Sequence, residues 1–145
     1  MNELKWWFRI VGGFYTLLGA MNLYFVLFGG ATMFRDTIPF PVDDFGVQAF
    51  VDGWSPFAFE MLGIGTFLLW ASRDPLKYLS AVYLIVWLEL LHGVVDDIYL
   101  IARGYDAIGY LVFIVIHFAI IVTGIVFVRQ AAAQPARLAA KGSAP

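Results

Sequence analysis

The stretch LIVWLELLHGVVDD, residues 84–97, sets three ionisable side chains into one of the most apolar parts of the chain: Glu89, His92 and Asp96. Spacings of three and four residues place these side chains on one face of a helix. A helix inside a bilayer carries such groups where they face other protein, because exposing them to lipid is costly. We therefore expect this helix to turn its polar face toward a site inside a helical bundle.

The composition is typical of a membrane protein. Of the 145 residues, 61% are hydrophobic, 18% are aromatic and 14% are charged, and the mean hydropathy is +0.80. A net charge of −2 gives no basis for binding nucleic acid. The sequence contains no cysteine, which excludes disulfides and thiol-based redox chemistry.

Four apolar segments are expected to form helices that cross the membrane, for which about 20 residues are needed. They are residues 7–28, 54–71, 78–101 and 108–128. The predicted fold class is all-α, a four-helix transmembrane bundle formed by a single domain, residues 1–128. A long loop separates the first two spans, and residues 129–145 form a flexible tail. The first span has an alternative interpretation as a cleaved signal peptide, which its length disfavours.

Basic residues predict the orientation of the spans. Seven of the nine Lys and Arg residues lie at the amino terminus, between spans two and three, or in the tail: Lys5, Arg9, Arg73, Lys77, Arg129, Arg137 and Lys141. Arg35 and Arg103 lie on the other side. By the positive-inside rule both termini are cytoplasmic, and the loop over residues 29–53 is extracytoplasmic.

Six polar side chains are expected within the spans: Asn22, Glu60, Glu89, His92, Asp96 and His117. Counted from the outer ends of the spans, they lie about 6 to 14 Å deep, in the outer half of the membrane. Because every span contributes, we predict one polar pocket open to the extracytoplasmic side. The inner half offers only hydroxyl groups, so we do not expect a proton or ion path across the whole membrane.

Two further expectations concern neighbouring residues. Asp97 and Arg103 lie at the outer boundary and are expected to form a solvated ion pair, which contributes little to stability. Close contacts between helices are expected at Gly19, Gly63 and Gly93, because small residues let helix backbones approach each other.

The spacing of Glu89 and His92 matches the E-x-x-H motif of carboxylate-bridged metal proteins built as four-helix bundles. Glu60 and His117 complete a set of two carboxylates and two imidazoles, suited to one zinc or iron ion. A two-metal site needs a second motif, which this chain lacks. The same side chains equally suit a hydrogen-bonded network that orients a ligand or fixes the order of the helices.

Three functions follow from these alternatives. The first is a membrane binding protein or accessory subunit whose outer pocket takes a small apolar, aromatic or lipid-like molecule, with Glu89, His92 and His117 contacting its polar end. The second is a single-metal membrane enzyme, an oxidoreductase or hydrolase, that uses these residues and Glu60. The third is a structural subunit of a membrane complex or homo-oligomer. The sequence identifies neither a ligand nor a reaction.

Four segments resemble the BphX-like family of small bacterial membrane proteins. They are LKWWFRIVGGFY (4–15), FEMLGIGTFLLWASRDP (59–75), LELLHGVVDDIYLIARGY (88–105) and VFIVIHFAIIVTG (112–124). The resemblance implies a four-span protein of the bacterial cytoplasmic membrane, from a family that occurs alongside genes for the degradation of biphenyl and other aromatic compounds. It implies that Glu60, Glu89, Asp96 and His117 belong to the family pattern, and it assigns no role to them.

Overall fold

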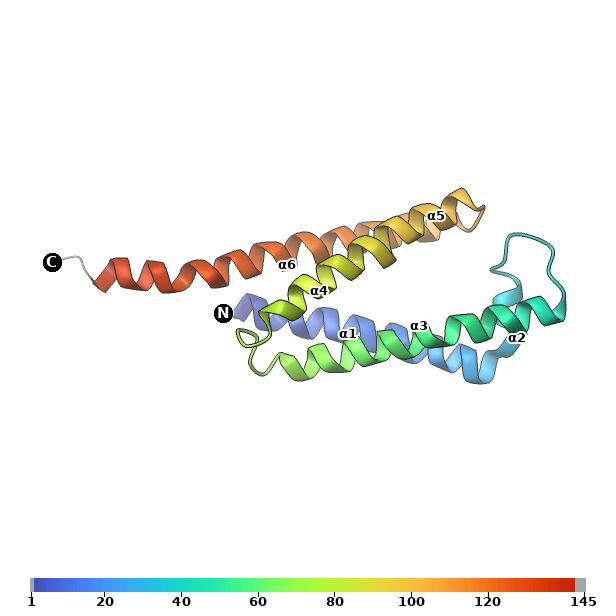
Figure 1. Cartoon of the computed structure of the whole chain (residues 1–145), viewed down its shortest axis with the longest axis horizontal. Coiled ribbons are helices and arrows are strands. Elements are labelled where there is room, and N and C mark those ends of the chain that lie inside the picture. Colours follow the sequence, from blue (N-terminus) through green and yellow to red (C-terminus); the bar gives the residue numbers. More distant parts are fainter. Residues whose placement is uncertain (1, 143–145) are drawn as a thin grey trace.

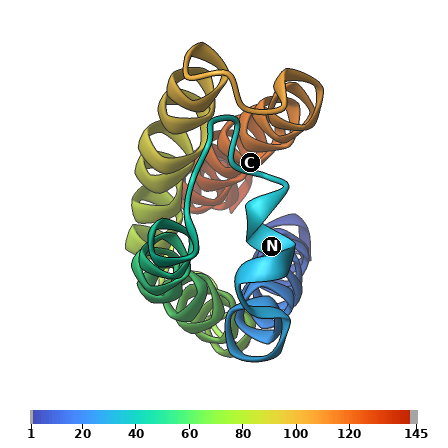
Figure 2. The same ribbon diagram turned by 90° about the vertical axis from the view of Figure 1, so that its right-hand side faces the viewer.

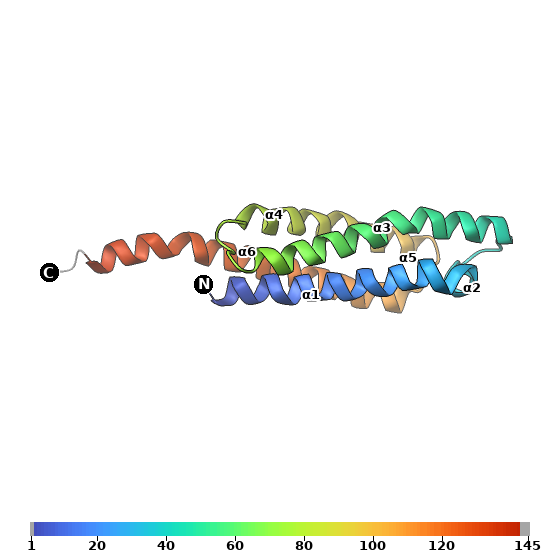
Figure 3. The same ribbon diagram turned by 90° about the horizontal axis from the view of Figure 1, so that it is seen from below.

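The computed structural model describes residues 2–142, and this part of the chain is all-helical. Four helical runs lie side by side and alternate in direction (Figures 1 and 3). The first run comprises α1 (Asn2–Tyr24), the π-helical segment η1 (Phe25–Gly29) and α2 (Gly30–Arg35), and the second is α3 (Asp44–Ala71). The third comprises α4 (Leu79–Leu88), the π-helical segment η2 (Glu89–Val95) and α5 (Asp96–Ala102), and the fourth is α6 (Ala107–Gly142).

Viewed along the bundle, the four runs are arranged around a common centre (Figure 2). The first run packs against α3 and α6, and η2 packs against α6. The amino terminus and the connection over residues 72–78 lie at one end of the bundle, whereas the connections over residues 36–43 and 103–106 lie at the other (Figure 1). We call these the amino-terminal end and the far end.

Two helices among the described residues are long and apolar enough to cross a membrane. They are Asn2–Gly29, with a mean hydropathy of 1.6, and Ala107–Ala133, with a mean hydropathy of 3.0. These helices contain the first and fourth predicted spans. Helical backbone continues beyond Val128 to Gly142, over most of the segment expected to be a tail, and residues 143–145 lie outside the described part.

The connection between the first two runs is much shorter than the predicted loop over residues 29–53, because α2 extends to Arg35 and α3 begins at Asp44. The side chain of Asp43 accepts a hydrogen bond from the Gly46 amide at 2.8 Å and so caps α3. A small apolar cluster forms beside this cap: Phe34, Ile38, Val47 and Val51. The prediction of a long loop is therefore wrong, because the end of η1, α2 and the capped helix α3 together occupy most of that segment.

The main apolar core draws side chains from all four runs: Leu4, Trp7, Phe8, Val11, Met61, Leu68, Val82, Ile85, Ile120 and Val128, among others. Trp7 Nε1 donates a hydrogen bond to Thr123 Oγ1 at 3.1 Å and so ties α1 to α6. Between α1 and α3 the backbones approach closely, since a methyl group on Gly19 would lie 2.5 Å from the Leu62 amide nitrogen. Gly63, by contrast, faces open space, so its predicted role in helix contact is wrong.

Candidate functional site

A buried series of four polar side chains joins the first, third and fourth helical runs. The hydroxyl of Tyr15 donates a hydrogen bond to Glu89 Oε1 at 2.7 Å, and His117 Nδ1 contacts Glu89 Oε2. On the other side of the imidazole ring, His117 Nε2 lies 3.4 Å from Asp97 Oδ2. We refer to Tyr15, Glu89, His117 and Asp97 as the polar chain.

Both carboxyl groups of the polar chain are removed from the surface, with Glu89 1% and Asp97 6% exposed. A buried carboxylate is costly unless hydrogen bonds compensate for the lost water. Glu89 meets this requirement with a partner at each oxygen. Asp97 does not: among the described side chains, those of residues 2–29 and 32–133, its Oδ2 is the one buried nitrogen or oxygen atom that has no hydrogen-bond partner.

The π-helical segment η2 decides which residues face the interior. The α-helical spacing predicts Glu89, His92 and Asp96 on one face, but the structure buries Glu89, Gly93 and Asp97 and leaves His92 and Asp96 exposed. In a π-helix the backbone hydrogen bonds span five residues instead of four, so each turn takes up more residues and the inward face shifts along the sequence. The structure thus corrects two expectations: Asp97 takes the place of Asp96, and it lies beside His117 rather than in a solvated ion pair.

The imidazole ring of His117 is held between η2 and α6. Gly93 lets the ring lie against the backbone of η2, because a Cβ atom at this position would be only 2.5 Å from His117 Cγ. The Phe113 ring stacks on the imidazole with a centroid separation of 6.2 Å and an interplanar angle of 28°. These contacts fix the ring where its two nitrogens face two different carboxyl groups.

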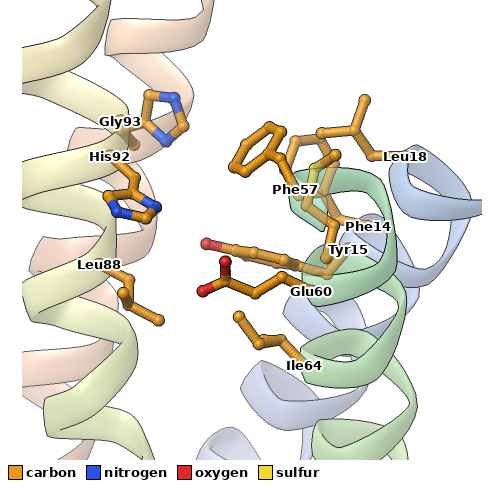
Figure 4. A pocket seen from close by; sticks show the side chains of 11 residues that line it. Phe14, Tyr15, Leu18, Phe57, Glu60, Ile64, Leu88, His92 and Gly93 are labelled. Atoms are coloured by element: carbon orange, nitrogen blue, oxygen red, sulfur yellow. The ribbon is translucent and has the colours of Figure 1, made fainter. Parts of the chain in front are cut away.

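A small cavity of about 50 Å³ adjoins the polar chain (Figure 4). Glu60 of α3 and His92 of η2 point into it from opposite sides, and Tyr15 lies between them (Figure 4). Most of the other lining residues are apolar, among them Phe14, Leu18, Phe57 and Ile64. A cavity of this volume has room for a few water molecules and is well below the roughly 150 Å³ of a cavity that holds an aromatic ring.

A larger pocket of about 370 Å³ lies between the first two runs and the segment over residues 100–110, which includes the connection over 103–106. Its walls are largely aromatic: Phe25, Phe34, Phe50, Trp54, Tyr105 and Tyr110. Asn22, Met33, Thr37 and Leu100 complete the lining. Trp54 Nε1 donates a hydrogen bond to Asn22 Oδ1 at 2.9 Å, and the Trp54 ring stacks on Phe50. We call this the aromatic pocket.

The six predicted site residues are therefore distributed over different places. Glu89 and His117 lie in the polar chain, Glu60 and His92 line the small cavity, and Asn22 lines the aromatic pocket. Asp96 belongs to none of them. Sequence reasoning missed Tyr15, Asp97 and the aromatic residues around Trp54.

The predicted metal ligands Glu60, Glu89, His92 and His117 are not gathered into a metal site. Across residues 2–142, no three His, Asp or Glu side chains come close enough together to hold a metal ion. The carboxylate of Glu89 is already engaged by Tyr15 and by His117. The arrangement is suited to hydrogen bonding and proton binding rather than to metal ligation.

These features define a small all-helical protein with two helices of membrane-spanning length and an ionisable polar chain in its interior. The chain belongs to the BphX-like family, whose model matches residues 1–134. This match confirms the family resemblance found in the four sequence segments. Comparison with curated proteins and with solved structures gave no significant match.

Proposed function

We propose that this protein crosses the bacterial cytoplasmic membrane four times and binds a small apolar molecule in the aromatic pocket. The observation that carries the binding proposal is the aromatic pocket itself, which has the volume and the lining of a ligand site. The membrane proposal rests on the distribution of polar and apolar side chains between the inside and the outside of the bundle.

Large apolar side chains cover the outside of all four runs, while the carboxyl groups of Glu89 and Asp97 lie inside. Examples of exposed apolar residues are Leu17, Phe59, Trp87 and Val115, the last of them 69% exposed. A helix of a water-soluble bundle shows the opposite pattern, with its polar face outward. The second and third runs are also long enough to cross a membrane, since α3 has 28 residues and the third run is continuous over residues 79–102. Four spans account for this surface because lipid would cover it.

The ends of the bundle differ in charge, which gives the orientation. Lys5 near the amino terminus and the pair Arg73 and Lys77 belong to the amino-terminal end, whereas Arg35 and Arg103 flank the connections at the far end. By the positive-inside rule the amino-terminal end is cytoplasmic. The aromatic pocket then opens in the outer half of the membrane.

The aromatic pocket favours an apolar ligand with few polar atoms. Its volume of about 370 Å³ falls in the range of small-molecule sites, about 300 to 1,000 Å³. The polar groups on its wall are the Asn22 amide and the hydroxyls of Thr37, Tyr105 and Tyr110. An aromatic or lipid-like molecule with one polar group matches this lining. The polar end of the ligand would contact these residues, and not Glu89, His92 and His117 as the sequence suggests.

Topology is testable by thiol labelling, because the chain contains no cysteine of its own. Single variants Lys77→Cys and Arg103→Cys would be expressed in bacteria and treated with a membrane-impermeant maleimide. We expect Arg103→Cys to react in intact spheroplasts and Lys77→Cys to react only after the membrane is permeabilised. Equal labelling of both variants in intact spheroplasts would contradict the proposed topology.

Ligand binding is testable by thermal unfolding in detergent with 1-naphthol as the probe. A ligand that binds the folded state raises its stability, by about 2.7 kcal/mol at a concentration of 100 times Kd. Leu100→Trp adds bulk to the pocket wall and should abolish the rise in Tm. Leu84→Trp, on the outer surface of α4, is the matched control and should keep it. A rise that survives Leu100→Trp would place the probe elsewhere.

A further inference from the structure

The polar chain contains three contacts, and each of them needs a hydrogen atom. These are the contacts of Tyr15 with Glu89, of Glu89 with His117, and of His117 with Asp97. A neutral tyrosine, a neutral histidine and two ionised carboxylates together supply only two such hydrogens. The count of hydrogens is the same whether the one between Glu89 and His117 is bonded to the carboxyl oxygen or to the imidazole nitrogen.

The missing hydrogen falls at the contact between His117 and Asp97. Both carboxylates only accept, and His117 is hydrogen-bonded to Glu89 through Nδ1, so the ring hydrogen of a neutral His117 lies on Nδ1 and Nε2 presents a lone pair to Asp97 Oδ2. The Asp97 side chain is only 8% exposed, and its Oδ2 has no other partner. Two buried acceptors facing each other at 3.4 Å are unfavourable, and one proton between them removes the conflict.

We propose that His117 and Asp97 together bind one proton, held between Nε2 and Oδ2. The proton resides on the imidazole as an imidazolium or on the carboxyl group as a neutral acid, and both forms place a hydrogen between Nε2 and Oδ2. Binding lowers the negative charge of the polar chain by one unit. None of the four residues of the polar chain lines the aromatic pocket.

The surrounding groups support a site that takes up a positive charge. Besides His117, the ionisable groups beside Asp97 are acidic: Asp96 precedes it in the sequence, and Glu89 contacts the other nitrogen of the same imidazole ring. The other titratable neighbours are Tyr15 of α1 and Tyr110 of α6, with Glu60 of α3 and His92 of η2 across the small cavity. Asp97 lies in α5, which ends at Ala102 next to the connection at the far end of the bundle (Figure 1).

The proposal is testable by spectroscopy on the full-length protein in lipid nanodiscs. The chain has two histidines, so His92→Gln leaves His117 as the one signal in the ¹⁵N spectrum of histidine-labelled protein. At a pH of about 7 we expect either an imidazolium spectrum or, by infrared spectroscopy, the carbonyl band of a protonated carboxyl group. Raising the pH should remove that signal as one proton leaves. The titration of the His92→Gln protein alone shows whether a proton is bound, even if a further variant fails to fold.

The variant Asp97→Asn identifies the partner of His117. The asparagine amide supplies a permanent hydrogen to Nε2, so the proton signal should be lost while Nδ1 stays protonated. Asp96→Asn is the matched control, because Asp96 is the adjacent and exposed carboxyl group, and it should leave the signal unchanged. A neutral His117 with no protonated carboxyl group in the parent protein would overturn the proposal. A signal that Asp96→Asn removes, or that Asp97→Asn retains, would also overturn it.

Discussion

Replacing Gly93 by alanine tests whether the position of His117 depends on the close approach of its ring to η2. The added methyl group would lie 2.5 Å from His117 Cγ, 2.6 Å from Nδ1 and 2.8 Å from Cδ2. Ordinary van der Waals contact begins at 3.4 Å, so the ring must retreat by about 0.9 Å. Such a movement separates Nδ1 from the carboxylate of Glu89.

The expected loss of stability combines three effects. Overpacking a tight site costs about 1–3 kcal/mol. A lost hydrogen bond to a charged partner costs about 1.5–3 kcal/mol. Alanine in a helix recovers about 0.5–1 kcal/mol relative to glycine. We therefore expect Gly93→Ala to lower the free energy of unfolding by about 1.5–5.5 kcal/mol.

Gly63→Ala is the matched control because a Cβ atom there meets nothing within 4 Å. This variant keeps the helix-propensity gain alone and should be as stable as the parent or more stable. Both variants would be compared by chemical denaturation in the same detergent, and the ¹⁵N spectrum of His117 would report the ring environment directly. If Gly93→Ala were as stable as Gly63→Ala and left that spectrum unchanged, the packing argument for His117 would be refuted.

Three other substitutions test separate contacts of the fold. Tyr15→Phe removes a donor to a buried carboxylate and should cost about 1.5–3 kcal/mol in denaturation experiments, whereas Tyr24→Phe, at an exposed ring, should have almost no effect. Asp43→Ala removes the cap of α3 and should cost about 1 kcal/mol, with faster amide exchange in the first turn of that helix as the specific readout. Trp7→Phe loses the hydrogen bond to Thr123 and should lower the Tm, and an unchanged Tm would show that this bond contributes nothing net.

The sequence predicts the all-helical fold because long apolar runs are a strong signal. It also predicts that Glu89 and His117 face the interior, since an ionisable group in such a run has few other places to go. The prediction that Asp96 faces the interior, and Asp97 the solvent, is wrong because it assumes 3.6 residues per turn through residues 89–95. A π-helical segment depends on tertiary packing, and the sequence pattern gives no direct sign of it apart from Gly93 beside the polar residues.

The sequence contains signals for the start of α3, although the predicted loop over residues 29–53 covers that start. Pro39 and Pro41 indicate a break in the helix, and the predicted loop over residues 29–53 extends beyond them on both sides. Asp43 is a favoured N-cap residue, and Val47 and Val51 follow it at helical spacing. Tyr15 was missed for a different reason, because a tyrosine in an apolar helix is usually a packing residue, and only the three-dimensional structure pairs its hydroxyl with Glu89.

The apolar contacts are unevenly distributed along the bundle, and this affects how it can open. At the amino-terminal end one core joins all four runs, whereas at the far end the cluster around Phe34 joins only the first two. Local opening should therefore begin at the far end, where fewer buried contacts must be broken to separate the first two runs from the last two. Amide hydrogen exchange should be faster in η1 and α5 than in the first half of α1. The bundle would then open at the far end while staying closed at its amino-terminal end, with the aromatic pocket in the part that opens.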